Sequence, residues 1–326
     1  MGAIEIDTSS FRFIITAIEP MILPGYKGST LRGGFGSTFR RIVCIVKDKE
    51  CLECLLRAKC IYSYVFETPP PADTKVMRKY EAAPHPFILE PPPERRRGYK
   101  PGDEMVFGLT LIGRAIDYLP YFIYTFEELG KTGLGKGRGR FELKTVVNHV
   151  PGVEGKAVDR IIYSSTTKML SDFQKVPLPL GTISFDDTTP ETSRLTLNFL
   201  TPTRISHNGH LTDAIEFHMI VRNLMRRISL LAYFHGNGHG LPDLDFNEII
   251  EKAKGVKVIR KRLRRYNWER YSGRQERRIS MDGFVGSITF EGEIEPFMPM
   301  IKAGEVLHIG KGTVFGLGRY KVQQEH

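Results

Sequence analysis

One segment of the chain occurs twice. The residues from Tyr118 to Phe141 recur, 179 positions later, as the residues from Phe297 to Tyr320, and the two segments align without a gap. They share a proline, three glycines and an arginine in one register, namely Pro120/Pro299, Gly133/Gly312, Gly137/Gly316, Gly139/Gly318 and Arg140/Arg319. An internal repeat of this kind predicts one fold that is used twice.

The chain length agrees with two domains. With 326 residues in total, each half is long enough to bury a core without support from disulfides. A polar linker at 186–190 predicts the change of domain. We therefore expect an N-terminal domain at 1–185 and a C-terminal domain at 186–326.

Each half opens with a strand that is followed by a helix. Apolar residues predict strands over 12–18 and 194–200. Helical patterns follow over 29–46, where Ser29 is the expected cap, and over 213–234. Further strands follow each helix, and each half is expected to finish on a strand, a glycine-rich loop and another strand. This order is typical of a ferredoxin-like α+β unit, so we expect two such domains in tandem.

Three local predictions complete this outline. Residues 66–102 contain nine of the twenty prolines, which interrupt both helices and strand ladders, so this insert is expected to be extended and to lie on the surface. The pattern of 159–173 indicates a helix, and Thr201–Thr203 indicates a turn.

Basic charge is concentrated in one segment. The formal net charge is +10, and residues 257–278 alone hold ten Lys or Arg against two Glu. Aromatic residues are interleaved with these cations, a combination that suits phosphate contact and base stacking in RNA or single strands. The alternative is a solvated charged face. The expected RNA-binding residues here are Lys257, Arg260, Arg264, Arg265, Trp268, Arg270, Arg274 and Arg278.

Glycine-rich loops close both copies of the repeat. Glycines let backbone amides approach a phosphate closely, so Lys311, Gly312, Gly316 and Gly318 are expected to contact RNA. Neither loop is a nucleotide-binding P-loop, because Gly137 stands where a Ser or Thr would hold magnesium. The alternative is a tight crossing between strands, and for the first copy the sequence favours neither reading.

All four cysteines lie within one short segment, as Cys44, Cys51, Cys54 and Cys60. A C-x-x-C pair with flanking cysteines predicts a structural zinc site, because four thiolates would leave the ion no open position. Two disulfides, an iron–sulfur cluster and reduced thiols are the alternatives.

Metal-dependent phosphodiester cleavage has no visible ligand set in the sequence, which contains no H-E-x-x-H motif and no spaced carboxylate cluster. Metal-free RNA cleavage requires only a group to deprotonate a 2′-OH, a group to protonate the leaving oxygen, and cations. His85, held between two prolines, is a candidate for this chemistry, and an ordinary surface-loop residue is its alternative.

Several motifs resemble those of the CRISPR precursor-RNA processing endoribonucleases of the RAMP superfamily, specifically a branch with a cysteine cluster. The resemblance rests on the cysteines followed by Tyr64–Glu67, and on Leu31–Gly36, Pro84–Phe87, Phe199–Arg204, Arg270–Gln275 and Gly310–Tyr320. It implies two ferredoxin-like domains with a C-terminal glycine-rich loop. It also implies metal-independent cleavage of repeat RNA that leaves 2′,3′-cyclic phosphate and 5′-OH ends and produces guide RNAs. The alternative is a non-catalytic RAMP subunit that binds RNA in an interference complex.

The sequence departs from that family in one respect. Many members carry a catalytic histidine on or near the first helix, whereas the first histidine of this chain is His85. The resemblance therefore leaves two possibilities, in which either His85 reaches back or catalysis is histidine-free. The corresponding neighbourhood holds Tyr26, Lys27, Arg32, Arg40 and Arg41. Of these, Tyr26, Lys27 and Arg41 are catalytic candidates beside His85, and Arg32 is a candidate RNA contact.

The N-terminus shows neither a basic n-region nor an apolar core, and no apolar run approaches the length that spans a membrane. We expect a soluble cytoplasmic protein whose partner is RNA, with subunits of CRISPR effector complexes as further partners and no membrane contact.

Overall fold

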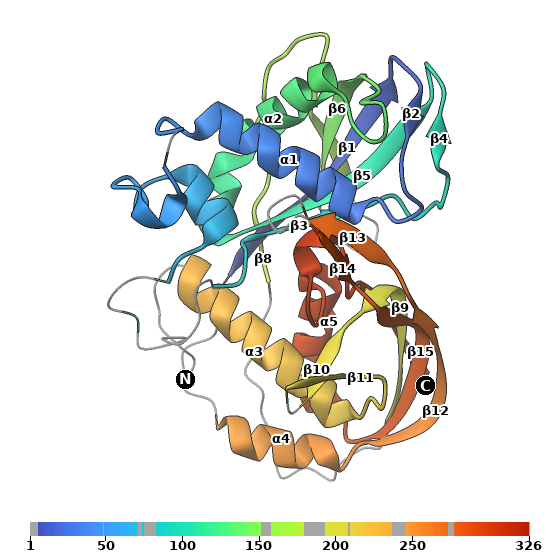
Figure 1. Cartoon of the computed structure of the whole chain (residues 1–326). Helices are drawn as coiled ribbons and strands as arrows, with labels where there is room; N and C mark the ends of the chain where they lie inside the picture. The colour runs from blue at the N-terminus through green and yellow to red at the C-terminus, as the bar shows by residue number, and fades with distance from the viewer. Residues whose placement is uncertain are drawn as a thin grey trace. The chain divides into compact units, whose positions relative to one another are not determined.

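The computed structural model describes residues 6–47, 49–70, 74, 83–150, 158–178, 193–207, 209–236, 245–272 and 277–325. Contacts within the chain divide it into two compact units (Figure 1). The N-terminal unit comprises 6–177 and 233–238, and the C-terminal unit comprises most of the remainder. The expected boundary between 185 and 186 lies outside the described residues and stays a prediction.

The N-terminal unit is built on an antiparallel sheet with strand order β3-β5-β1-β6-β7, in which β8 also pairs with β1. The bounds are β1 Asp7–Ala17, β3 Phe87–Glu90, β5 Glu104–Ile112, β6 Phe141–Val150, β7 Val158–Ser164 and β8 Val176–Pro177. A separate two-stranded pair joins β2 (Met21–Ile22) to β4 (Gly98–Tyr99).

Two helices pack against this sheet, α1 (Gly28–Val43) and α2 (Leu119–Thr132). Phe35 of α1 stacks on Phe122 and Phe126 of α2, with ring centroids 4.8 and 5.2 Å apart. Phe126 also packs 5.1 Å from Phe13 of β1. Since all four rings are fully buried, each contributes about 1.5–3 kcal/mol of hydrophobic stabilisation. The helices and the sheet are therefore joined by one aromatic core.

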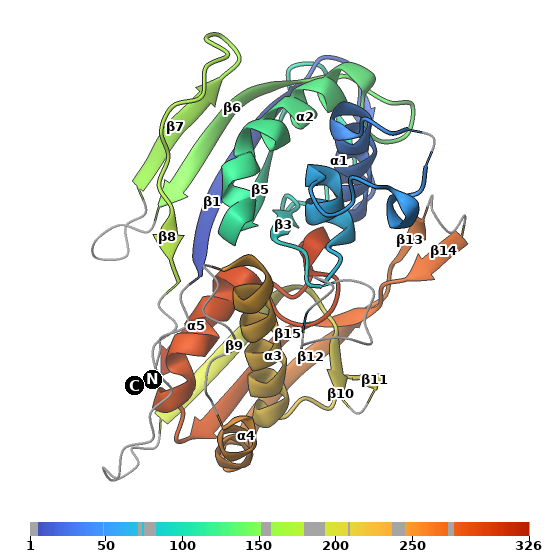
Figure 2. The same cartoon turned by 90° about the vertical axis from the view of Figure 1, so that its left-hand side faces the viewer.

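The C-terminal unit repeats this plan with strand order β12-β15-β9-β16, of which β9, β15 and β12 are labelled in Figure 2. The bounds are β9 Ser193–Thr203, α3 Phe217–His235, α4 Phe246–Lys254, β12 Lys257–Tyr266, β15 Gly283–Gly292, α5 Met298–Leu307 and β16 Tyr320–Glu325. Two hairpins complete it, β10 Ile205–His207 with β11 His210–Thr212, and β13 Glu269–Ser272 with β14 Arg277–Ser280. Its core centres on Phe217, whose ring lies 5.2 Å from Phe290 and 5.3 Å from Phe297.

The repeated segment adopts corresponding positions in the two units. Pro120 and Pro299 lie in the first turns of α2 and α5, where the missing N–H of proline costs nothing. After each helix the chain returns to the first strand of its unit. Ile18 N donates to Arg140 O, and Leu200 N donates to Arg319 O, both at 2.9 Å. The second copy differs in one respect, because α5 ends at Leu307 and its loop begins a turn earlier.

Two predictions were wrong because strand pairing overrides local pattern. Residues 159–173 do not form a helix, since β7 pairs antiparallel with β6 over the first part of this range. The proline-rich insert is not wholly superficial, because β3 lies within it and pairs with β5. Phe87, Ile88 and Leu89 of β3 are completely buried.

Helix and strand ends also differ from expectation. Ser29 does not cap the first helix, because α1 already begins at Gly28 and its N-cap residue is Lys27, which makes no side-chain capping bond. Thr201–Thr203 does not form a turn but continues β9. Among the described helices, none is long and apolar enough to cross a membrane.

Candidate functional site

The glycine loop of the C-terminal unit spans 308–319. Gly310, Gly312, Gly316 and Gly318 all adopt positive φ values between 74° and 82°. A Cβ at Gly318 would lie 1.8 Å from Ile309 O, and one at Gly310 would lie 2.4 Å from Arg204 O. These two positions therefore exclude any side chain, since the backbones pass too closely.

Several backbone amides of this loop donate to acceptors within the C-terminal unit. Lys311 N donates to Arg204 O, Gly316 N to Thr313 O, and Gly318 N to Pro202 O. The hydroxyl of Thr201 donates to Gly316 O at 2.8 Å. The loop is thus fixed against the end of β9. Phosphate contact by Lys311, Gly312, Gly316 and Gly318 stays a prediction. Because several of the loop's amides already donate within the unit, such contact would depend chiefly on the side chains that lie beside the loop.

Two arginines lie beside this loop. Arg270 of β13 places its guanidinium 5.0 Å from the ring centroid of Phe315 in the loop. Arg204, which follows β9, donates from Nε to Asp282 O at 3.0 Å. Burial lowers the pKa of both side chains, and the positive charge of Arg204 lowers that of Arg270 further. Arg270 Nε is buried and finds no hydrogen-bond partner among the described residues.

The pair is chemically suited to an anion. Two guanidinium groups of like charge repel each other, and a phosphate between them would relieve that repulsion and supply acceptors for their N–H groups. Arg204 was not singled out in the sequence. Its position at the end of the first strand of the second half, facing the repeated glycine loop, is the signal that could have identified it.

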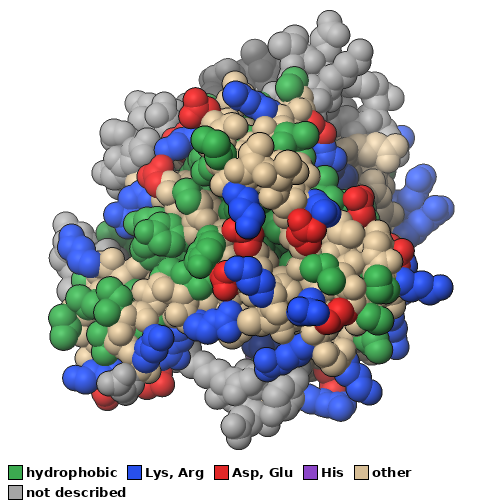
Figure 3. All heavy atoms as spheres, turned by 90° about the horizontal axis from the view of Figure 1, so that it is seen from above, with side chains coloured by type: hydrophobic (Ala, Val, Ile, Leu, Met, Phe, Trp, Pro, Cys, Tyr) green, Lys and Arg blue, Asp and Glu red, His purple; other side chains and the backbone are tan. Residues whose placement is uncertain are grey.

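The basic segment forms the strand β12 and the hairpin β13–β14. β12 is an edge strand, and Lys257, Arg260, Arg264 and Arg265 on it are exposed. Arg265 pairs with Asp213 at 3.1 Å. Cations also protect an edge strand from pairing with other chains, so exposure here agrees with either role. On the face drawn in Figure 3, Lys and Arg side chains are spread among acidic ones.

The remaining residues of this segment are placed less uniformly. Trp268 is half-buried, and its backbone N donates to Asp282 Oδ1 at 3.1 Å. Arg278 lies 3.6 Å from Glu269 across the β13–β14 hairpin. Arg274 lies outside the described residues. The structure therefore brings Arg270 to the glycine loop and leaves the strand cations as a separate exposed row.

Among the catalytic candidates, Tyr26 and Lys27 lie at the start of α1. Lys27 is 1 % exposed, and its Nζ donates to Glu94 O at 2.8 Å. Burial lowers the pKa of this amine. Arg41 lies in the last turn of α1 and is exposed. Since fourteen residues of helix span about 21 Å, Lys27 and Arg41 do not meet in one site.

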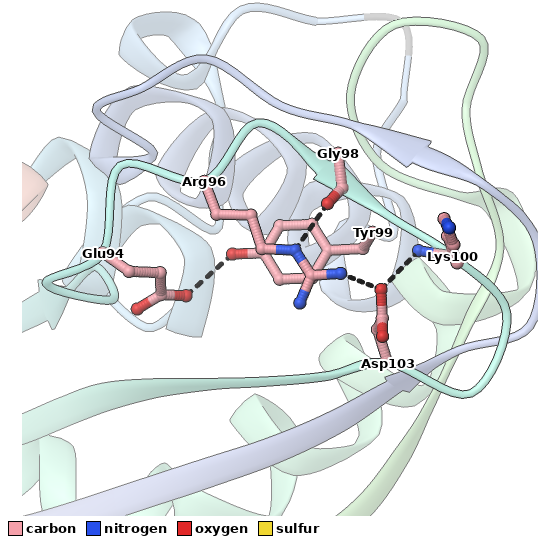
Figure 4. A network of polar contacts seen from close by, with 6 residues as sticks. All are labelled: Glu94, Arg96, Gly98, Tyr99, Lys100 and Asp103. Carbon is pink, nitrogen blue, oxygen red and sulfur yellow. Dashed lines mark hydrogen bonds and ion pairs between the residues drawn. The ribbon is translucent and has the colours of Figure 1, made fainter.

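A polar network fixes the segment that covers Lys27 (Figure 4). The Tyr99 hydroxyl donates to Glu94 Oε1 at 2.8 Å, and the pKa of Tyr99 is raised by burial and by that carboxylate. Arg96 stacks 4.7 Å from the Tyr99 ring centroid and pairs with Asp103. Asp103 also accepts from Lys100 N at 2.6 Å. This network holds Lys27 away from solvent.

His85 lies before β3, with its Nδ1 2.8 Å from the Thr68 hydroxyl and its ring stacked 6.1 Å from Phe87. Arg32, from the middle of α1, places its guanidinium 4.9 Å from the ring centroid of Phe66. Phe66 in turn lies 5.4 Å from Phe87. His85 and Arg32 therefore flank the same aromatic cluster, whereas Tyr26 with Lys27 and Arg41 occupy the two ends of the helix.

A second histidine lies next to His85. His235, the last residue of α3, places Nε2 2.7 Å from Pro84 O and Nδ1 3.1 Å from the Tyr64 hydroxyl. Because a carbonyl can only accept, Nε2 carries the proton, and Nδ1 accepts from Tyr64. Burial raises the pKa of Tyr64 to about 12. No sequence signal linked His235 to this cluster, since its partners are far away along the chain.

The four cysteines are free and half-buried. Cys44 caps the end of α1 and directs its thiol to Val46 O at 3.1 Å. Burial raises the pKa of the Cys51 thiol, and the nearby Glu67, Cys44 and Cys60 raise that pKa further. The thiols are of the type that zinc prefers. Among the described residues, however, no three His, Cys, Asp or Glu side chains are grouped closely enough to hold a metal, so zinc stays a prediction.

Comparisons with known proteins agree with this two-unit architecture. An uncharacterized protein of Archaeoglobus fulgidus is 23% identical over 92% of this chain and 93% of its own length. Among solved structures, a Cas6 product complex matches 97% of this chain and 100% of its own, at 16% identity and a TM-score of 0.56. A partial Cas6–RT–Cas1–Cas2 complex matches 98% of this chain and 46% of its own, at 12% identity and a TM-score of 0.55.

Family models cover both units. Residues 6–175 match the N-terminal domain model AF_1859_N, and residues 197–320 match the model of the CRISPR-associated endoribonuclease Cas6. Membership of a cysteine-cluster branch stays a prediction. With an α+β fold that resembles Cas6 over nearly its whole length, the chain belongs to the Cas6 family of CRISPR-associated endoribonucleases in the RAMP superfamily.

Proposed function

We propose that this protein is a metal-independent endoribonuclease that cleaves CRISPR repeat RNA in a precursor transcript. In this reaction the 2′-OH attacks the adjacent phosphate, which leaves a 2′,3′-cyclic phosphate and a 5′-OH end. The observation that carries the proposal is the pair Arg204 and Arg270 beside the glycine loop. Their like charges and the unpartnered Nε of Arg270 suit a phosphodiester group.

The transition state of this reaction gains negative charge on the phosphate oxygens, and fixed cations stabilise it more strongly than they stabilise the ground state. The tethering of the loop to β9 supports a fixed position for such cations. The exposed cations of β12 would hold the rest of the RNA through its phosphates, with RNA as the principal partner.

The reaction also requires groups that remove and supply protons. His85 is the best candidate, because its contact with Thr68 orients the ring. Tyr26 is a second candidate, at the start of α1. Lys27 would act only if the cover formed by Glu94 and Tyr99 opened, since its amine is buried and already donates.

The burial of Lys27, and the absence of histidine from α1, favour a second candidate function. In that alternative the chain is a non-catalytic RAMP subunit that binds guide RNA within a CRISPR effector complex. The two functions share the fold and the arginine pair, and they differ in whether RNA is cut.

One assay separates them. Repeat RNA labelled at its 5′ end is incubated with the protein in excess EDTA, with a matched RNA that carries a single 2′-deoxy nucleotide at the cut position. We expect cleavage of the first RNA only, with a cyclic phosphate on the product. Tight binding with both RNAs intact would support the non-catalytic subunit, and cleavage of the 2′-deoxy RNA would contradict the mechanism.

We further infer that the two units are copies of one ferredoxin-like fold. The support is the shared order of strands and helices, together with the matching hydrogen bonds that follow the repeated segment. We also propose a structural zinc ion at Cys44, Cys51, Cys54 and Cys60. Elemental analysis of the purified protein should find one zinc per chain, which Cys54→Ser should remove. Iron in place of zinc, or no metal, would contradict this site.

A further inference from the structure

The N-terminal unit contains a cleft of about 830 Å³ that the proposed function does not use. One face of α1, the end of α2, the residues after β2 and the loop 133–138 line it. Its charged lining residues are Arg41, Arg97, Lys136 and Arg138, and no carboxylate lines it. The cleft is thus uniformly positive.

Three of these cations, Arg97, Lys136 and Arg138, differ from basic neighbours along the chain. Lys131 pairs with Glu128 at 2.5 Å, and Arg140 pairs with Glu19 at 2.7 Å, whereas Lys136 and Arg138 between them form no ion pair in the described part of the chain. In the same way Arg96 pairs with Asp103, and the adjacent Arg97 lines the cleft. Within these segments, the cations that face the cleft are the ones left without a counter-charge.

The walls that carry these cations are held in place by the backbone. Lys136 N donates to Ile22 O at 2.9 Å, and Leu23 N donates to Arg97 O at 2.8 Å. Arg138 adopts a φ of 52°, in the left-handed region that residues other than glycine rarely occupy. Such strained positions cluster at ligand-binding sites, because the surrounding structure must enforce them.

We propose that this cleft binds the sugar–phosphate backbone of a single RNA strand. Four cations without a counter-charge match successive phosphates, and the apolar side chains of Leu23, Leu129 and Leu134 in the same cleft would contact riboses or bases. The volume lies near the upper end of the range of about 300–1,000 Å³ for small-ligand sites, which favours a strand over one phosphate. The proposal rests on the proposed function only for the identity of the RNA.

The matched variants each remove three positive charges. The cleft variant combines Arg97→Gln, Lys136→Gln and Arg138→Gln. The control variant combines Lys131→Gln, Arg140→Gln and Lys144→Gln, whose side chains are ion-paired and do not line the cleft. Affinity for a single-stranded repeat RNA, protected by a 2′-deoxy nucleotide at the cut position, is measured from about 50 to 300 mM salt. Thermal unfolding checks that both variants fold.

We expect the cleft variant to bind about 10- to 100-fold more weakly and its slope of log affinity against log salt to fall by about 2, since each lost phosphate contact of a single strand removes about 0.7. The control variant should change affinity less than about threefold. Equal losses in the two variants would overturn the proposal. Displacement of the RNA by a ribonucleoside monophosphate of equal affinity would also overturn it, in favour of a nucleotide site.

Lysine footprinting of the wild-type protein tests the same cleft without depending on how the variants fold. Lysines are acetylated with and without RNA, and modified peptides are quantified by mass spectrometry. RNA should protect Lys136 at least about fivefold and leave Lys131 unchanged, and equal modification would refute the cleft. If Lys136 is protected but RNA is never cut, the endoribonuclease proposal fails and the cleft stands. If RNA is cut without protection, only the cleft fails.

Discussion

Replacement of Gly304 by alanine tests how the glycine loop is anchored. Gly304 lies within α5, and a Cβ there would be 2.0 Å from Tyr320 Oη and 2.6 Å from Leu224 Cδ2. Tyr320 ends the repeated segment, and its buried hydroxyl donates to Ile301 O at 2.5 Å. A methyl group at this position must therefore displace the tyrosine that follows the loop.

The expected cost combines three contributions. A broken buried hydrogen bond costs about 1–3 kcal/mol, and overpacking costs about 1–3 kcal/mol more. The higher helix propensity of alanine returns up to about 1 kcal/mol. The net effect of Gly304→Ala is a loss of about 2–4 kcal/mol in the free energy of unfolding. For a chain of 326 residues that corresponds to a fall of about 3–6 °C in Tm.

Thermal and urea unfolding measure this effect, and Gly33→Ala provides a matched control. Gly33 lies within α1, is exposed, and a Cβ there would meet nothing within 4 Å, so its replacement should stabilise the protein by up to about 1 kcal/mol. The double variant Gly304→Ala/Tyr320→Phe should regain at least about 1 kcal/mol relative to additivity, because the clashing oxygen is gone. Wild-type stability for Gly304→Ala would refute the close approach.

Three further predictions concern RNA and pH. Arg270→Gln should weaken RNA binding about tenfold and lower the slope of log affinity against log salt by about 0.7–0.9, as titration at several salt concentrations would measure. The control is Lys252→Gln, which changes an exposed lysine that is ion-paired. His85→Ala should abolish cleavage in EDTA without changing RNA affinity, and retained cleavage would make Tyr26 the next candidate. Because burial lowers the folded-state pKa of Lys27, the unfolded chain binds more protons between that lowered pKa and pH 10.5. Stability should therefore rise as pH increases through the folded pKa, and urea unfolding of Lys27→Met should lack that rise.

Much of the architecture could be predicted from the pattern of the sequence. The repeat at a constant offset predicted corresponding glycine-rich loops in the two units and the strand after each loop, β6 and β16. The segment before each loop, which was expected to be a strand, forms the helices α2 and α5. The two opening helices were placed correctly to within a few residues. By contrast, β7 and β3 were missed, because their strand identity comes from partners that are distant along the chain.

Only part of the candidate site could be predicted from the sequence. Cationic and aromatic composition identified the segment that contains Arg270, but not its neighbour Arg204, since that pairing depends on how β9 and the hairpin meet the loop. The family resemblance also grouped Lys27 with Arg41, whereas a helix of this length separates them by about 21 Å. Lys27 further proved to be buried, which no local pattern indicates.

The sequence by itself determined that one fold occurs twice, that cations are concentrated near the second glycine loop, and that the motifs are those of Cas6-like RAMP proteins. These properties are local, since they depend on residue types at fixed spacing. Only the tertiary structure decided which cations are neutralised by carboxylates and which face the cleft or the loop without a counter-charge. Electrostatic environment depends on distances in space, and the backbone bonds of Lys136 to Ile22 and of Leu23 to Arg97 bring to one cleft charges that are far apart along the chain.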